Sequence, residues 1–179
     1  MHGQADDDSL AQLAASGDET AFTMLFKRHY RMIHAFAHRI CLDASLAEDV
    51  AQETFVKAAR ELASRGFQGT FKPWLYRIAK NGAIDLIRRR LRESRHLQFE
   101  SSERPANFDT TDPGHEKLTS ALARLGPELR AAIALVYFDQ LNHAEAAASL
   151  GCAETTVSWR IFQAKRKLRK WLTSKELPS

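Results

Sequence analysis

Apolar residues recur every three or four positions along most of the chain, which is the pattern of amphipathic helices. The clearest stretch runs from Thr20 to Cys41, where Leu25, Ile33 and Phe36 fall on one side of a helix with 3.6 residues per turn. No segment of the 179 residues shows a convincing alternation of apolar and polar positions, the mark of a half-buried strand. The sequence therefore predicts an all-α protein.

Two further helices are predicted in the first half of the chain. Ser45 and Glu48 have the spacing of a capping box, so we expect a helix to begin there and to continue to about Ser64. The loop Arg65–Thr70 contains two glycines, and the next helix is expected from about Pro73 to Arg92. Together with a short N-terminal helix, these elements predict one small bundle.

The composition changes in the middle of the chain. Residues 100–114 contain Ser, Pro, Asn, Thr, Asp and Gly with little periodicity, which is typical of a linker. The helical pattern resumes near Glu116. We therefore expect two small helical domains, residues 1–95 and residues 117–179, joined by an acidic flexible linker at residues 96–116.

The last part of the chain has the form of a helix-turn-helix: a short helix from about His143 to Leu150, a turn at Gly151 and a longer basic helix from about Glu154 to Leu172. The longer helix carries an inward apolar stripe of Val157, Ile161, Ala164 and Leu168. Its other sides carry Ser158, Trp159, Phe162 and Gln163. Aromatic and hydrogen-bonding side chains outside the apolar stripe fit the major groove of DNA, and the alternative is that Trp159 packs on a neighbouring helix.

Charge is distributed unevenly, although the net charge is only +4. Residues 72–95 hold eight Lys or Arg and two acidic residues, and residues 155–171 hold six Lys or Arg and no acidic residue. Residues 1–21, by contrast, hold five acidic residues and no Lys or Arg. Two separate cationic segments predict two contacts with a polyanion, and the alternative is two solvated helix faces.

The helices of the first half carry two different polar faces. Opposite the apolar side of the helix 73–92 we expect Arg77, Asn81, Ile84 and Arg88, a set that suits phosphates and an exposed base. The preceding helix carries an acidic face of Asp49, Gln52 and Glu53. An acidic face repels DNA, so it predicts a positively charged protein partner.

The composition also excludes several classes of protein. The chain is 44% hydrophobic and 27% charged, which is ordinary for a folded protein. No apolar run approaches the roughly 18–20 residues that cross a bilayer, and the N-terminus lacks the pattern of a secretory signal. Its two cysteines provide neither a disulfide framework nor a four-cysteine zinc site. We expect no membrane insertion and a cytoplasmic location.

Several segments resemble bacterial sigma factors of the sigma-70 family, in particular the small extracytoplasmic-function (ECF) group. The segments Ala47–Phe55, Phe71–Asn81 and Asp85–Arg90 resemble conserved region 2 of that family. The segment Leu122–Pro127, with motifs scattered from Arg130 to Leu168, resembles region 4. The resemblance covers about residues 20–95 and 118–172, in the order that the family shows.

The resemblance implies a subunit that joins core RNA polymerase, recognises the −10 and −35 promoter elements, and helps to melt the promoter. It implies polymerase binding by Asp49, Gln52 and Glu53. The −10 element would be bound by Gly66, Phe67, Arg77, Lys80, Asn81 and Arg88. The −35 element would be bound by Thr156, Ser158, Trp159, Arg160, Phe162, Gln163 and Lys165. Core RNA polymerase and promoter DNA, both double- and single-stranded, are the expected partners, and the family also allows for an anti-sigma factor.

Two alternatives stay open at this point. A helix-turn-helix regulator that does not join polymerase would explain residues 118–172 but not the motifs of the first half. A metal-dependent protein is the second, because His34, His38 and Cys41 lie within roughly 60° on one helix face. No fourth ligand, nucleophile–base set or phosphate loop is evident, so we predict no metal, no cofactor and no enzymatic activity.

Overall fold

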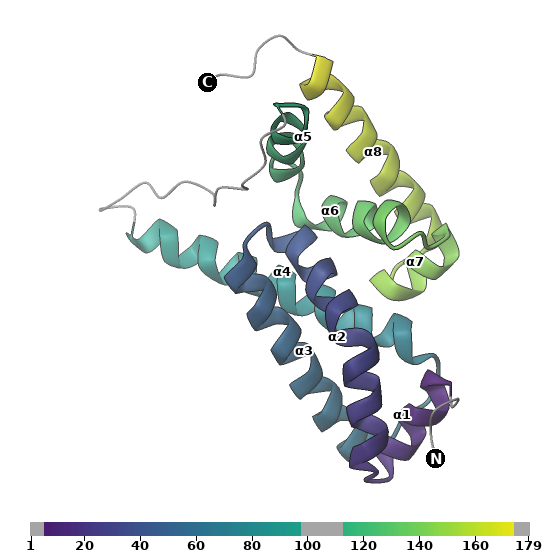
Figure 1. Cartoon of the computed structure of the whole chain (residues 1–179). Helices are drawn as coiled ribbons and strands as arrows, with labels where there is room; N and C mark the ends of the chain where they lie inside the picture. Colours follow the sequence, from purple (N-terminus) through teal and green to yellow (C-terminus); the bar gives the residue numbers. More distant parts are fainter. Residues whose placement is uncertain (1–5, 98–112, 174–179) are drawn as a thin grey trace.

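The computed structural model describes residues 6–97 and 113–173, and the regular elements in these ranges are all helices, as the sequence predicts. The first group, drawn from purple to teal in Figure 1, comprises α1 (Asp7–Ala15), α2 (Glu19–Cys41), α3 (Ala44–Arg65) and α4 (Phe71–Leu97). The second group comprises α5 (Pro113–Ala123), α6 (Pro127–Ile133), a π-helical turn η1 (Ala134–Phe138), α7 (His143–Leu150) and α8 (Glu154–Thr173).

The predicted linker at residues 96–116 overlaps helices at both of its ends. Residues 96 and 97 still belong to α4, and α5 begins at Pro113, so residues 113–116 are helical as well. The rest of the predicted linker, residues 98–112, lies outside the described residues.

Helices α1–α4 form one bundle with an apolar interior. Leu25, Phe36 and Leu75 are fully buried there, and the Phe36 ring meets the Tyr76 ring edge-on with centroids 4.9 Å apart. The helix 20–41 predicted from periodicity matches α2, whose buried side chains recur at three- and four-residue intervals. The periodic pattern therefore identified the inward side of this helix correctly.

The start of α3 differs from the prediction. Its N-cap is Asp43, whose Oδ1 accepts a hydrogen bond from the Leu46 amide at 2.8 Å. The capping box predicted for Ser45 and Glu48 is wrong, because Glu48 accepts bonds from Tyr30 and other side chains instead of from a backbone amide at the helix start. Asp and Ser are both good N-caps, and the sequence offers both within three positions.

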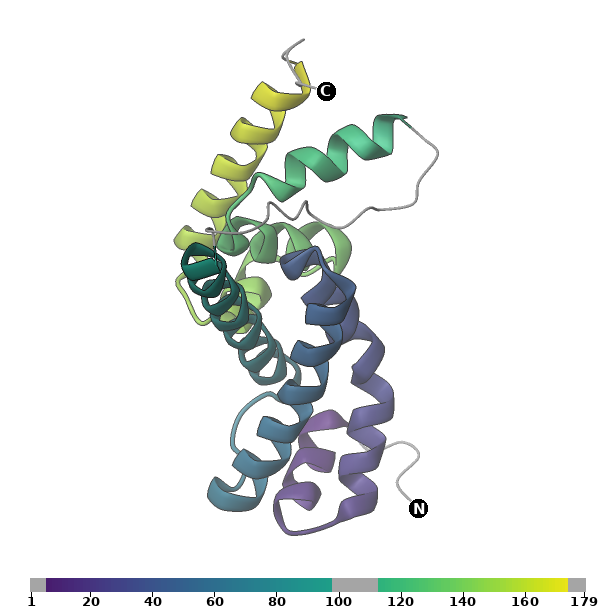
Figure 2. The same cartoon turned by 90° about the vertical axis from the view of Figure 1, so that its left-hand side faces the viewer.

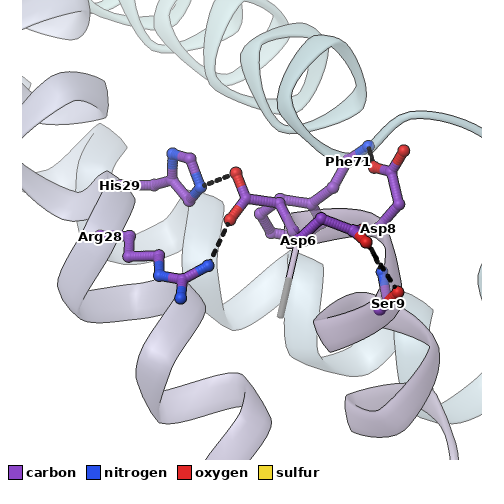
Figure 3. Close-up of polar contacts among 7 residues, drawn as sticks. Asp6, Asp8, Ser9, Arg28, His29 and Phe71 are labelled. Carbon is purple, nitrogen blue, oxygen red and sulfur yellow. Dashed lines mark hydrogen bonds and ion pairs between the residues drawn. The ribbon is translucent and has the colours of Figure 1, made fainter. Parts of the chain in front are cut away.

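The acidic N-terminal segment is built into the bundle, as Figure 3 shows. Asp6 caps α1 by accepting a hydrogen bond from the Ser9 amide at 2.8 Å. Hydrogen bonding from Ser9 lowers the pKa of the Asp6 carboxyl group. Asp7 accepts from Arg28 Nη1 at 3.0 Å and lies 2.7 Å from His29 Nε2. Both contacts tie the start of α1 to α2.

Asp8 connects α1 to the distant start of α4. Its Oδ1 accepts a hydrogen bond of 2.6 Å from the Phe71 amide, 63 positions along the chain (Figure 3). The first amides of a helix have no partner within the helix, so Asp8 serves as an N-cap supplied by another helix. This contact also fixes the end of the Arg65–Thr70 loop.

We expect Asp8→Ala to loosen the start of α4. Loss of an N-cap costs about 1 kcal/mol, so the Phe71 amide should exchange its hydrogen about fivefold faster. Hydrogen exchange followed by NMR measures this directly. Asp6→Ala is the matched control, because it removes the cap of α1 and leaves the Phe71 amide bonded. Equal acceleration at Phe71 in both variants would contradict the role of Asp8.

The helix-turn-helix boundaries predicted from the sequence are confirmed in the second group. Pro127 begins α6, and Gly151 ends α7 with φ of +64°, in the left-handed region where glycine carries no steric cost. Asn142 and Glu145 form a capping box at the start of α7. Arg130, only 9% exposed, donates to the Ala123 and Leu125 carbonyls and so ties α6 to the end of α5.

The two groups of helices pack against each other (Figures 1 and 2). Helix α7 lies along α4, and α2 contacts α6 and η1, so the buried side chains of both groups form one continuous cluster. Ile84, expected on the exposed side of α4, is only 3% exposed. The prediction failed there because α4 is covered by α2 and α3 on one side and by α7 on another.

Candidate polymerase and nucleic-acid interfaces

The outer side of α8 carries two large exposed aromatic side chains. Trp159 and Phe162 are 58% and 59% exposed, whereas Val157 is fully buried and Ile161 is 5% exposed. The division between an inward stripe and an outward face is therefore as predicted. Trp159 does not pack into the domain, so the alternative of a structural tryptophan is not supported.

The polar residues on the same side of α8 are oriented by neighbouring side chains. Ser158 Oγ lies 2.9 Å from His143 Nδ1, at the start of α7. Gln163 Oε1 accepts from Arg166 Nη2 at 2.7 Å. His143 was not among the predicted site residues, although it stands at the start of the helix-turn-helix, where the first helix approaches the second.

The predicted basic and hydroxyl residues of α8 lie in different surroundings. Arg160 is half-buried and pairs with Glu128 at 2.9 Å, which links α8 to α6. Lys165 is exposed, and its Nζ lies 5.0 Å from the centre of the Tyr137 ring. Thr156 is half-buried in the first turn. Among these three, Lys165 is the most accessible to a phosphate.

The basic side of α4 carries the residues predicted for the −10 element. Arg77, Asn81 and Arg88 are exposed and follow one another at four- and seven-residue steps, so they share a side of the helix. Lys80 is half-buried, and its Nζ donates to the Leu150 carbonyl at 3.2 Å. The structure therefore places the predicted residues together, with Lys80 engaged by α7.

The glycine-containing loop before α4 is held by aromatic contacts. Gly66 ends α3 with φ of +71°. The half-buried Phe67 ring lies 6.0 Å from Phe71 and 5.6 Å from Trp74, centre to centre and edge-on in both cases. The loop is consequently attached to the first turn of α4, next to the Phe71 amide that Asp8 caps.

The acidic face of α3 is exposed as predicted. Asp49, Gln52 and Glu53 all reach solvent, and Gln52 Nε2 donates to Glu48 Oε1 at 2.7 Å. Glu48 Oε1 also accepts from Tyr30 at 2.7 Å, which fixes the border between α2 and α3. Hydrogen bonding to Tyr30 lowers the pKa of the Glu48 carboxyl group. The Glu48 carboxylate at the edge of this face is therefore held in place by Tyr30 and Gln52.

Two apolar residues lie next to this acidic face and were not among the predicted polymerase-binding residues. Val56 is 42% exposed and Phe26 is 38% exposed, and the Phe26 ring lies 5.0 Å from that of Phe55. Phe26 follows the apolar period of α2, so the sequence pattern assigns it to the interior. Only the packing of α2 on α3 shows that it lies at the edge.

The metal alternative finds no support in the described residues. There, no three His, Cys, Asp or Glu side chains are arranged to hold a metal ion. His34 Nε2 lies 3.5 Å from Glu48, and burial lowers the pKa of His38. Burial also raises the pKa of the Cys41 thiol to about 12. Across residues 6–97 and 113–173, none of the helices has the length and apolar character needed to cross a bilayer.

Comparisons with known proteins agree with this arrangement. Residues 25–93 match the family model of sigma-70 region 2, and residues 115–168 match that of sigma-70 region 4. RNA polymerase sigma factor NccH of Alcaligenes xylosoxydans xylosoxydans is 34% identical, over 96% of this chain and 97% of NccH. The ECF RNA polymerase sigma factor SigM of Mycobacterium tuberculosis strain H37Rv is 32% identical, over 96% of this chain and 86% of SigM.

Solved structures give the same result. The structure of CnrH in complex with the cytosolic domain of CnrY superposes with a TM-score of 0.70 at 30% identity, over 96% of this chain and 100% of CnrH. The sigma factor RpoE of Bartonella quintana, in complex with the anti-sigma factor NepR, gives 0.66 at 26% identity, over 87% of this chain and 98% of RpoE.

The basic sides of α4 and α8 and the acidic face of α3 thus belong to a protein of the sigma-factor class. This chain is a member of the sigma-70 family, in its ECF group. A helix-turn-helix regulator that does not join polymerase would explain only the match to region 4. The match of residues 25–93 to region 2 argues against this alternative.

Proposed function

We propose that this chain directs RNA polymerase to promoters, with α3 binding core enzyme, α4 and the loop before it binding the −10 element, and α8 reading the −35 element. The observation that carries the proposal is the separation of surfaces. Two exposed basic faces lie in the segments that match regions 2 and 4, and the acidic face of α3 is the natural contact for a protein partner. In this role the first domain ends with α4 and the second begins with α5, close to the predicted bounds of residues 1–95 and 117–179.

The acidic face of α3 suits a basic protein surface. Asp49 and Glu53 supply charge complementarity, which speeds encounter and fixes the orientation of the partner. Val56 and Phe26 lie beside them and supply exposed apolar area that contact with polymerase would bury. The combination is typical of a specific protein interface with an apolar centre and a charged rim.

The outer side of α8 suits the major groove of the −35 element. Ser158 and Gln163 carry hydrogen-bonding groups for base edges, and the Trp159 and Phe162 rings fit against thymine methyl groups. Lys165 and other exposed basic residues of α8 supply attraction to phosphates. Arg160, paired with Glu128, would hold α8 on α6 and contribute positive charge from there.

We infer that the chain has no catalytic activity of its own and acts in the cytoplasm, where transcription takes place. Both inferences are supported by its relatives, which are sigma factors. We also propose an anti-sigma factor as a further partner, because RpoE of Bartonella quintana is bound to one in its structure. No cofactor or metal is part of this proposal.

Run-off transcription is the experiment that tests the proposed function. Core RNA polymerase, with and without the full chain, transcribes a pool of genomic fragments, and the products are sequenced. We expect the chain to produce specific start sites preceded by shared −10 and −35 sequences. A regulator that does not join polymerase would bind duplex DNA, fail to co-elute with core enzyme, and produce no new start sites.

The two kinds of contact proposed for α8 should be separable by substitution. We expect Gln163→Ala to lose roughly 1–3 kcal/mol of discrimination at one −35 position. Lys165→Ala should weaken all promoters alike and reduce the salt dependence by about one charge. A −35 library transcribed at two salt concentrations measures both.

Arg166→Ala is the matched control for the Gln163 substitution, because Arg166 holds the Gln163 amide in place. It should broaden the preference at the same position without changing the preferred base. An equal loss at every promoter after Gln163→Ala would refute base reading by this residue.

A further inference from the structure

The hydroxyl group of Ser158, on the proposed −35 side of α8, is bonded to a side chain of another helix. Its Oγ lies 2.9 Å from Nδ1 of His143, which is the first residue of α7 and follows the N-cap Asn142. Ser158 is exposed, whereas His143 is half-buried. One of the proposed base-reading side chains is therefore held from outside its own helix.

This arrangement differs from that of other hydroxyl groups in the helices. The hydroxyls of Thr54, Ser149 and Thr173 each donate to the carbonyl four residues earlier in the same helix, at 2.6 to 2.9 Å. Within residues 6–97 and 113–173, the hydroxyl of Ser158 is bonded to the His143 ring instead. The imidazole therefore fixes the rotation of this hydroxyl group.

The direction of this hydrogen bond determines what Ser158 offers to a base. A serine hydroxyl has one hydrogen and two lone pairs. If the hydrogen is donated to His143, only lone pairs face the groove, and they accept from the amino groups of adenine or cytosine. If the imidazole donates instead, the Ser158 hydrogen is left for guanine or thymine oxygens. The imidazole thus decides which bases Ser158 can bind.

The surroundings of His143 favour Nδ1 as the acceptor. A neutral imidazole carries one proton, and in water this proton prefers Nε2. The hydrogen bond made by one ring nitrogen sets the state of the other. In the part of the chain that the structure describes, no donor meets His143 Nε2 that would draw the proton to Nδ1. Nε2 can therefore keep the proton, and Nδ1 can accept from Ser158.

We propose that His143 is a positioning residue for the −35 element: its Nδ1 accepts the Ser158 hydrogen, so that Ser158 selects adenine or cytosine over guanine and thymine at one position. The inference rests on the −35 role proposed for α8. His143 itself touches no base. Selection arises because guanine and thymine bring an acceptor against the Ser158 lone pairs and leave both groups without a hydrogen bond.

The direction of the bond is tested on the full chain without DNA, at about pH 8, where histidine side chains are ordinarily neutral. Proton–nitrogen correlation NMR spectra distinguish protonated from unprotonated ring nitrogens, and the signal missing in His143→Asn identifies His143. We expect Nδ1 to be unprotonated, with its signal shifted by the hydrogen bond, and Ser158→Ala to remove that shift. A proton on Nδ1 would overturn the proposal.

Base selection is tested with holoenzyme formed from the full chain and core polymerase, binding a library of −35 duplexes. We expect the wild type to favour adenine or cytosine about fivefold at one position, and His143→Ala to reduce this preference to about twofold or less. His143→Asn should restore the preference, because its Oδ1 takes the place of Nδ1. His143→Gln, whose amide lies further out, should not.

A double substitution shows whether His143 acts through Ser158. Ser158→Ala should abolish the preference, and adding His143→Ala should change nothing further at that position. Asn142→Ala is the matched control, because it removes the cap of α7 beside His143 and keeps the imidazole. It should weaken all −35 sequences alike. Circular dichroism confirms that each variant is folded.

Three results at the −35 position would also overturn the proposal: an equal loss for all four bases after His143→Ala, additive effects of the His143 and Ser158 substitutions, or no rescue by His143→Asn. The NMR result does not depend on the promoter assignment. Failure of run-off transcription by wild-type holoenzyme would instead contradict the proposed function, so the two failures are distinguishable.

Discussion

Reversing the charges of Asp49 and Glu53 should abolish binding to core RNA polymerase while leaving the fold intact. Both side chains are exposed, and the nearest ion pair, between Glu53 and Lys57, spans 3.9 Å at the surface, so the double substitution to lysine costs little folding free energy. At a basic partner surface it replaces attraction by repulsion, which costs several kcal/mol. We expect binding to weaken by roughly a hundredfold or more.

Titration of fluorescently labelled core enzyme measures this loss. The neutral pair Asp49→Asn with Glu53→Gln should give an intermediate affinity, because it removes attraction without adding repulsion. Glu19→Lys with Glu61→Lys makes the same change of net charge on other parts of α2 and α3 and should leave binding nearly unchanged. Undiminished binding of the folded Asp49 and Glu53 double variant would remove α3 from the polymerase interface.

The parts of the fold that depend on local spacing could be predicted from the sequence. The inward stripe of α8 and the exposed Trp159 and Phe162 follow from 3.6 residues per turn. The end of α7 follows from the tolerance of Gly151 for positive φ. The acidic face of α3 was also found, because Asp49, Gln52 and Glu53 share one side of a helix whose other side is apolar.

The parts that depend on distant contacts could not be predicted. Asp8 caps α4 from 63 positions away, and Ile84 is buried because α4 has neighbours on more than one side. Phe26 follows the apolar period of α2 and still lies at the edge of its contact with α3. Asp139 accepts hydrogen bonds from Arg39 and Tyr76, which belong to two other helices, and no local motif marks it as their acceptor.

The predicted −10 site shows how the two kinds of information combine. Spacing alone placed Arg77, Asn81 and Arg88 on one side of α4, and the structure agrees. Lys80 was assigned to the same surface, but only the packing of α7 shows that its Nζ is already bonded. Asn81 therefore gives the cleaner test of base recognition, because its exposed side chain can be removed without breaking the contact between Lys80 and Leu150.

Asn81→Ala should impair promoter melting much more than −35 binding. An exposed base is recognised through hydrogen bonds to its edge, and an amide side chain provides both a donor and an acceptor. Loss of such a contact is worth roughly 1–3 kcal/mol, which is about tenfold to a hundredfold in open-complex formation. Permanganate reactivity of unpaired thymines measures promoter melting, and binding of a duplex that contains only the −35 element measures −35 binding. Asp85→Ala, at an exposed position four residues further along α4, is the control and should melt promoters as well as the wild type, because it removes a negative charge and no base contact. If Asn81→Ala melts promoters normally, or if it weakens −35 binding to the same extent, the base that starts melting is held elsewhere, and the Phe67 loop becomes the next surface to test.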